Sequence, residues 1–264
     1  MSSQDDVVLL NVENGIARIR FNRPAALNAI DEAVARGFLL ACEAVSQRSD
    51  VRVIVLSGAG RAFMAGGDVR KMREAGADAA PLVDALLGFL NPALLLLADL
   101  PLPVLASVHG AVAGAGVGVA LAADLAIAAD DTQFNLAYAR IGTTPDAGAT
   151  WLLPRLIGLR RALEMVLLTE TYDAAEALRL GLVNRVVPSA ALEAETDALA
   201  RRLASGPTLA HGRAKRLIRA ALDVTLKEQL EAERATFKES TRTADYLEGV
   251  AAFVEKRPPR FRGS

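Results

Sequence analysis

The sequence predicts an α/β domain followed by a helical module. Two observations support this fold class. Strand-like and helix-like patterns alternate through about the first 190 residues. Beyond Ser189 the chain lacks strand signals. We therefore expect an α/β core over 1–195 and a C-terminal helical module over 196–264.

The chain begins with a hairpin pattern. Two apolar runs, Val7–Val12 and Ile16–Phe21, flank an Asn-Gly pair, which is a strong signal for a tight turn. A loop at Asn22-Arg23-Pro24 leads into a helix-period stretch over 30–47. The continuous β-branched run Val51–Leu56 then predicts a buried strand.

Small residues follow that strand in two clusters, at 57–60 and at Ala65-Gly66-Gly67. Helical spacing resumes at Val69, and we expect Asp68 to cap this helix. A further helix is predicted over 81–97, with a bend at Asn91-Pro92 because proline interrupts helical hydrogen bonding.

The central stretch runs from Pro103 to Asp130. The apolar run Val104–Val108 predicts a buried strand, and a segment of almost only Gly, Ala and Val follows His109-Gly110. Such residues let the backbone approach a neighbour closely, and the first N–H groups of a helix lack internal partners. The segment is therefore suited to holding a negatively charged oxygen.

The rest of the core is expected to finish with one strand and then helices. Leu125–Ala129 predicts a strand, 134–141 is ambiguous, and a loop at 142–146 leads into a helix near 147–156. The pattern from Arg160 onward is helical except at 181–187.

Composition narrows the function. The chain is 52% hydrophobic and 23% charged, with one cysteine and two histidines, which argues against a disulfide framework and a His-rich metal site. The first eight residues are polar and acidic, unlike a signal peptide, and the apolar runs are interrupted. We expect a cytoplasmic protein that meets neither a membrane nor nucleic acid.

Charge is unevenly distributed along the chain. From Arg201 onward 14 Lys and Arg face 8 Asp and Glu, although the whole chain has a net charge of −1. Solvated helix faces explain this excess most simply. The alternative is that the basic end meets a phosphorylated ligand or an acidic subunit face.

Several catalytic motifs are absent. The sequence has no G-x-S-x-G and no G-x-x-x-x-G-K-[ST], and the third glycine of a dinucleotide loop falls on Val119. The remaining chemistry would use carboxylates and backbone dipoles. Ala65-Gly66-Gly67 and Gly114-Ala115-Gly116 could converge into an oxyanion hole, or could serve only close helix–sheet packing.

Five segments resemble the crotonase superfamily of enoyl-CoA hydratases and isomerases, and they occur in the family's order. They are Asn22-Arg23-Pro24 with 26–29, Arg61–Asp68, Val112–Gly116, Gly181-Leu182-Val183 and 249–257. The resemblance implies a spiral of ββα units, a C-terminal helical module that forms trimers or dimers of trimers, and acyl-CoA thioester substrates. It implies no cofactor beyond the CoA that the substrate carries.

The same resemblance implies roles for individual residues. The oxyanion donors would be the backbone N–H groups of Gly67 and Ala115. Substrate and CoA contacts would come from these positions: Arg23, Ala25, Ala26, Leu27, Ala65, Gly66, Asp68, Tyr138 and Lys256. For Tyr138, core packing is an equal alternative, and for Lys256 and Arg257 so is simple solvation.

Two departures from the family pattern bear on the reaction. Family hydratases use two glutamates, and the matching positions here hold Gly118 and Tyr138. A glycine transfers no proton, and a tyrosine with an ordinary pKa near 10 is a poor base at neutral pH. Ordinary hydratase chemistry is therefore not expected.

Asp146 remains as a candidate acid/base. An aspartate before a helix is usually an N-cap, but the segment 142–155 is similar to the superfamily branch of phenylacetate-pathway ring-epoxide (oxepin-forming) isomerases, as are 89–92 and 244–250. Enzymes of that branch also move a cis-3 double bond to trans-2. We expect the apolar neighbours Ile141, Ala147 and Leu152 to raise the pKa of Asp146.

Three alternatives stay open. Asp146 could be a nucleophile, as in the superfamily's aroyl-CoA dehalogenases, although Asn91 stands where those have a histidine. The chain could be a divergent hydratase, or an acyl-CoA-binding homologue without activity. Among other residues, we expect His109 in a turn and Trp151, Leu152 and Leu153 in the core.

Overall fold

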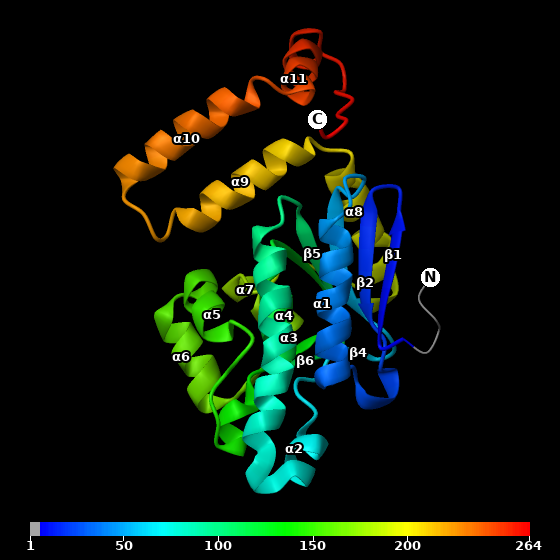
Figure 1. Cartoon of the computed structure of the whole chain (residues 1–264), viewed down its shortest axis with the longest axis vertical. Coiled ribbons are helices and arrows are strands. Elements are labelled where there is room, and N and C mark those ends of the chain that lie inside the picture. The colour runs from blue at the N-terminus through cyan, green and yellow to red at the C-terminus, as the bar shows by residue number, and fades with distance from the viewer. Residues whose placement is uncertain (1–5) are drawn as a thin grey trace.

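The structure is a computed structural model, which describes residues 6–264. The prediction that the N-terminus is unlike a signal peptide depends on the first eight residues, and residues 1–5 lie outside the described part of the chain. The described chain forms two sheets, helices around them and a helical arm (Figure 1). The mixed α/β architecture agrees with the predicted fold class.

The larger sheet has six strands in the order β1-β2-β3-β5-β7-β10. Its first two strands form the predicted antiparallel hairpin, and every other pairing in it is parallel. The strands are β1 (Val8–Glu13), β2 (Ile16–Phe21), β3 (Val53–Gly58), β5 (Val104–Val108), β7 (Leu125–Ala129) and β10 (Arg185–Val187).

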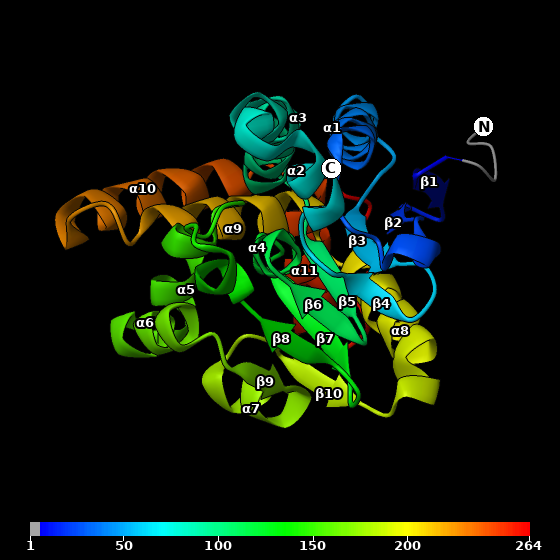
Figure 2. The same cartoon turned by 90° about the horizontal axis from the view of Figure 1, so that it is seen from below.

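Alternate residues of the larger sheet enter two different cores. Ile54 and Leu56 face α1 (Glu32–Ser46) and α3 (Ala79–Asp99), whereas Val53 and Val55 pack with α8 (Leu192–Ala204). Because both faces are covered, β3 is apolar along most of its length, as the sequence predicted. Figure 2 shows α1 and α3 side by side over one side of the sheets, with α8 near the opposite face.

A second sheet was not expected from the sequence. It has the order β4-β6-β8-β9, with β4 (Ala62–Met64), β6 (Ala111–Ala113), β8 (Gln133–Asn135) and β9 (Thr171–Asp173). Each strand has three residues, too short for a two-residue period to be visible. Here β8 and the 3-10 helix η3 (Ala137–Ile141) resolve the stretch whose structure the sequence left ambiguous.

The second sheet explains the spiral. The chain passes from β3 into β4, from β5 into β6 and from β7 into β8 within a few residues, and a helix follows each pair. The parallel pairings β4–β6 and β6–β8 then place the carboxyl ends of these three strands at one edge. This edge carries the candidate site.

The remaining helices complete the core and form the arm. The shorter helical elements of the core are η1 (Pro24–Ala26), α2 (Val69–Ala75), η2 (Gly76–Asp78), α4 (Ala115–Leu121), α5 (Ala149–Ile157), α6 (Leu159–Leu168), α7 (Ala174–Leu180) and η4 (Ser189–Ala191). The arm consists of α9 (Thr208–Ala220), α10 (Leu226–Ser240) and α11 (Ala244–Val254), and extends from the core in Figure 1. The boundary expected between the core (1–195) and the helical module (196–264) falls inside α8, which runs from Leu192 to Ala204.

The stretch Val69–Asp99 is long and apolar enough to cross a membrane by length and composition alone. In this fold α3 packs along α1 through the buried side chains of Leu86, Leu90, Ala93 and Leu97. Pro92 lies inside α3, which continues to Asp99.

Candidate active site

Two glycine-rich strand ends meet at the edge of the smaller sheet. Met64 at the end of β4 pairs with Val112 in β6, so the residues that follow them, Gly66 and Gly114, come together. A Cβ built on Gly66 would lie 3.4 Å from the Gly114 Cα, and one built on Gly114 would lie 3.3 Å from the Gly66 Cα. Both glycines have positive φ, so any side chain here would be strained as well as crowded.

The N–H groups of Gly67 and Ala115 follow these glycines. Gly67 forms its bridge to Ile30 through its neighbours, since Ile30 N donates to Gly66 O and Asp68 N donates to Ile30 O. Ala115 is the first residue of α4, where a helical N–H has no intrahelical acceptor. The structure thus brings the two expected donors onto touching strand ends, each with its N–H group outside the regular hydrogen-bond pattern.

Asp146 lies next to this edge and is held by Tyr138. The Tyr138 hydroxyl donates a short hydrogen bond to Asp146 Oδ1, and a Cβ built on Gly114 would lie 3.8 Å from that hydroxyl. Tyr138 comes from η3, which follows β8, the direct neighbour of β6. Three adjacent strand ends therefore bring together Gly66, Gly114 and the Tyr138–Asp146 pair.

Burial raises the pKa of the Asp146 carboxyl above its ordinary value, although the Tyr138 hydrogen bond acts in the opposite direction. Burial is also the main cause that raises the pKa of Tyr138, assisted by the negative charge of Asp146. The direction for Asp146 is the one expected from its apolar neighbours. It does not cap the following helix, whose N-cap is Gly148.

The backbone next to Asp146 is unusual. Ala147 has a φ of 49° and is buried, and left-handed backbone costs an alanine about 1–2 kcal/mol. Its Cβ would lie 2.7 Å from a Cβ built on Gly118, and its carbonyl oxygen would overlap that atom. The space that a side chain at 118 would occupy is therefore filled by the Asp146 loop, which accounts for a glycine in α4.

A large cavity adjoins the two residues that follow Asp146. It has a volume of about 830 Å³ and lies between α3, α5 and α9, with Ala147 and Gly148 in its wall. Its apolar lining includes Leu94, Leu95 and Leu152. Asn91 also lines it.

Trp151 corrects a prediction. It was expected in the core but is 45% exposed and lines this cavity, with the Arg155 guanidinium 3.8 Å from its ring centroid. Leu153, in contrast, is fully buried, as predicted. The amphipathic turn of α5 points Trp151 into the space between helices, which sequence position alone does not reveal.

The cavity wall formed by α9 was missed in the sequence. Lys215 ties α9 to the core, because its ammonium donates to the carbonyl oxygens of Leu97 and Leu102 and lies 3.0 Å from Asp124. Arg219 also pairs with Asp124, at 2.8 Å. The i, i+4 spacing of Lys215 and Arg219 indicates that both side chains lie on one face of α9. Their common partner, Asp124, lies in a distant part of the chain, so the sequence did not reveal the contact.

The loop expected along CoA is fastened to the end of β4. Asn28 is fully buried, and its side-chain amide donates to the carbonyl oxygens of Ala59, Ala62 and Phe63. Leu27 O accepts from Ala65 N. Asn28 belongs to the quoted motif, but its structural role was not predicted.

Asp68 does not act as the predicted cap. It stands at the N-cap position of α2 without a side-chain capping bond, and its carboxylate lies 3.4 Å from Arg23. Arg23 also pairs with Asp31 at 3.1 Å, and Lys71 pairs with Asp31 at 2.7 Å. Ala25, Ala26 and Leu27 lie in or beside η1, so the expected CoA segment is flanked by a charge-balanced cluster of two cations and two carboxylates.

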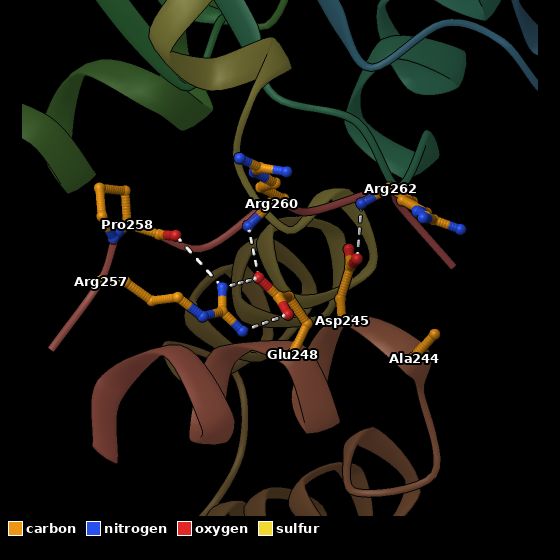
Figure 3. A pocket seen from close by; sticks show the side chains of 7 residues that line it. All are labelled: Ala244, Asp245, Glu248, Arg257, Pro258, Arg260 and Arg262. Carbon is orange, nitrogen blue, oxygen red and sulfur yellow. Dashed lines mark hydrogen bonds and ion pairs between the residues drawn. The ribbon is translucent and has the colours of Figure 1, made fainter. Parts of the chain in front are cut away.

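The tail residues Lys256 and Arg257 lie apart from this edge. Figure 3 shows Arg257 paired with Glu248 in a second cavity of about 610 Å³, which is lined by α11 and the tail. Lys256 is exposed. Of the candidate residues, Lys256 follows α11 at the end of the arm, whereas Gly66, Gly67, Ala115 and Tyr138 gather at the edge of the smaller sheet.

His109 lies in the short link between the strands β5 and β6, and not at a strand-to-helix turn, and its Nε2 lies 2.9 Å from Gly60 O. Among residues 6–264 no group of three or more His, Cys, Asp or Glu side chains is arranged to hold a metal ion.

Comparison with known proteins identifies relatives over nearly the full length. Residues 11–264 match the family model "Enoyl-CoA hydratase/isomerase". The chain is 42% identical to a "Probable enoyl-CoA hydratase" of Rhodobacter capsulatus, covering 96% of both chains. It is 38% identical to the 1,2-epoxyphenylacetyl-CoA isomerase of Escherichia coli, covering 98% of this chain and 99% of the relative.

A solved structure shows the same fold. The crystal structure of an enoyl-CoA hydratase from Bacillus anthracis superposes with a TM-score of 0.92 at 31% identity, covering 98% of this chain and all of the other.

Proposed function

Since this chain belongs to the enoyl-CoA hydratase/isomerase family, within the crotonase superfamily, we propose that it is an acyl-CoA isomerase with a single acid/base. The reaction moves a 3-enoyl double bond to the trans-2 position, or converts a ring epoxide to an oxepin. The observation that carries the proposal is one half-buried carboxylate, Asp146, beside two touching glycine strand ends.

A double-bond shift needs one group that first accepts and then donates a proton. The Asp146 carboxylate removes a proton from C2 of a 3-enoyl thioester, which leaves a dienolate. The N–H groups of Gly67 and Ala115 stabilise the negative thioester oxygen, each donor contributing about 3–4 kcal/mol in a dry site. The same carboxyl returns the proton at C4, so no water and no redox partner is consumed.

The arrangement favours this chemistry over hydration. Hydration needs a second group for the water, and Ala147 fills the space at Gly118 while Tyr138 is occupied by Asp146. Burial makes Asp146 a stronger base than a solvated aspartate because its pKa is raised. We expect the acyl group to enter the cavity between α3, α5 and α9, and we expect no added cofactor.

The test compares substrates and one substitution. Purified protein is incubated with cis-3-hexenoyl-CoA and with crotonyl-CoA, and products are resolved by chromatography. We expect the trans-2 isomer, with turnover at least about a hundredfold lower in Asp146→Asn because the base is lost. Asp84→Asn, an exposed aspartate on α3, is the matched control and should retain activity.

Other outcomes identify the alternatives. Formation of 3-hydroxyacyl-CoA would indicate the hydratase, the activity named for the Rhodobacter capsulatus relative. CoA binding without turnover would indicate a binding protein. Unchanged turnover in Asp146→Asn would rule out Asp146 as the base. A ring-epoxide thioester, tested in parallel, decides between aliphatic and aromatic substrates.

A further inference from the structure

Tyr138 occupies the place of a family glutamate but makes a different contact. The residue is 9% exposed, and its hydroxyl donates to Asp146 Oδ1. Tyr138 does not line the large cavity, so its main polar contact is with Asp146. Its role therefore concerns the carboxylate more directly than the acyl chain.

Two hydrogen bonds span the loop between Tyr138 and Asp146. Thr143 N donates to Tyr138 O, and the side chains join across the same loop. Asp146 O in turn accepts from Ala149 N at the start of α5. The backbone of the loop is thus tied to η3 and to α5, and the Oδ1 atom of the carboxylate accepts from the phenol of Tyr138.

Oδ2 has no comparable partner. Among residues 6–264, no side chain donates a hydrogen bond to Asp146 Oδ2, and Tyr138 is the one side chain that acts on the carboxyl's ionisation. The charged groups on the elements packed around the loop have other partners or line the cavity; they are Arg140, Arg155, Asp99, Arg213, Lys215, Arg216, Arg219 and Glu239. The two carboxyl oxygens are therefore inequivalent.

We propose that Tyr138 is a positioning residue for Asp146: its hydroxyl holds Oδ1 and leaves Oδ2 to exchange the proton with the substrate. This inference depends on the proposed isomerase function. An O–H donor bonds more strongly to a carboxylate than to a carboxylic acid, so Tyr138 favours the basic form that the first step requires. Partial burial acts in the opposite direction, because it raises the pKa of Asp146 and so makes the carboxylate a stronger base. The hydrogen bond from Tyr138 offsets part of this rise.

The substitution Tyr138→Phe keeps the ring and removes the hydroxyl. We expect KM to change less than about twofold and kcat at neutral pH to fall about tenfold, because the base loses its orientation. The acidic limb of the kcat/KM profile should move up by about one pH unit, since a lost hydrogen bond to a charged group raises its pKa. Lost packing alone would not move this limb.

Tyr172→Phe is the matched control. Tyr172 is also buried, 8% exposed, and in the described part of the chain its hydroxyl has no hydrogen-bond partner. This variant should keep both kcat and the pH profile. An equal fall in both variants would overturn the positioning role.

A second readout does not depend on turnover. The chain has three tyrosines, so labelling with tyrosine that carries 13C at Cζ gives a spectrum that single substitutions can assign. The Tyr138 signal should titrate with the Asp146 carboxyl in the wild type and lose this inflection in Asp146→Asn. A signal that is independent of pH in the wild type, or that titrates unchanged in Asp146→Asn, would overturn the inference.

The activity assays and the tyrosine titration together distinguish a failure of the proposed function from a failure of the role of Tyr138. If the inflection is present but no variant isomerises a 3-enoyl thioester, the proposed function is wrong and the coupling of the pair is supported. If isomerisation depends on Asp146 but Tyr138→Phe leaves the pH profile unchanged, the function holds and the role of Tyr138 is overturned.

Discussion

Ionisation of the Asp146 carboxyl has a cost in stability. Asp146 is half-buried, and this partial burial is the largest influence on the pKa of its carboxyl, which lies above the ordinary value. A group whose pKa is higher in the folded than in the unfolded chain makes the folded state bind its proton more tightly. The ionised carboxylate therefore destabilises the fold above its folded-state pKa.

We predict that Asp146→Asn stabilises the protein while it removes activity. The melting temperature should rise by about 2 °C at pH 8, because the neutral amide avoids the cost of burying a charge. The difference should shrink as the pH falls through the folded-state pKa and vanish below about pH 4. Differential scanning calorimetry from pH 4 to 8 measures it, and a less stable variant at pH 8 would contradict it.

At the scale of elements, the contact between α4 and the Asp146 loop decides where the carboxylate lies. Gly118 is buried in α4, and the Ala147 backbone occupies the space beyond its Cα. Ala147 is itself held at positive φ. A change in α4 is thus transmitted directly to the residue next to the base.

We predict that Gly118→Ala displaces this loop. Overpacking of this kind costs about 1–3 kcal/mol of unfolding free energy, and isomerase activity should fall at least about tenfold. Gly88→Ala is the control, since a Cβ there meets nothing within 4 Å in the middle of α3. The control should be neutral or gain about 0.5–1 kcal/mol. Urea unfolding and the hexenoyl-CoA assay measure both, and equal behaviour would refute the steric argument.

At the scale of the whole molecule, the spiral and the helical arm have separate consequences. The spiral brings three strand ends of the smaller sheet to one edge, and the arm closes the cavity through α9. The arm also exposes large apolar side chains: Phe253 is 87% exposed, Leu226 74% and Phe237 68%. Exposed apolar surface of this kind indicates an interface.

We predict a homotrimer or a dimer of trimers assembled through this arm. Sedimentation velocity should give a mass of three or six copies of the 27.8 kDa chain. Phe253→Asp should shift the distribution toward the monomer, because the carboxylate would be buried without a partner. A monomeric wild type at micromolar concentration would contradict the prediction.

The sequence by itself determined the elements with strong local patterns. The Asn-Gly hairpin, the strands β3, β5 and β7 and most long helices follow from periodicity and turn chemistry, which depend on near neighbours in the chain. The glycine clusters and Asp146 were found because their residue types, together with the family resemblance, limit the available chemistry.

Only the tertiary structure decided the rest. The smaller sheet has strands too short to be predicted, and its pairing brings Gly66 to Gly114 from segments far apart in the sequence. Asp68 pairs with Arg23, Trp151 lines a cavity, and Tyr138 bonds to Asp146 rather than only to the core. Each of these outcomes depends on which surfaces meet after folding, and local sequence patterns carry no information about that.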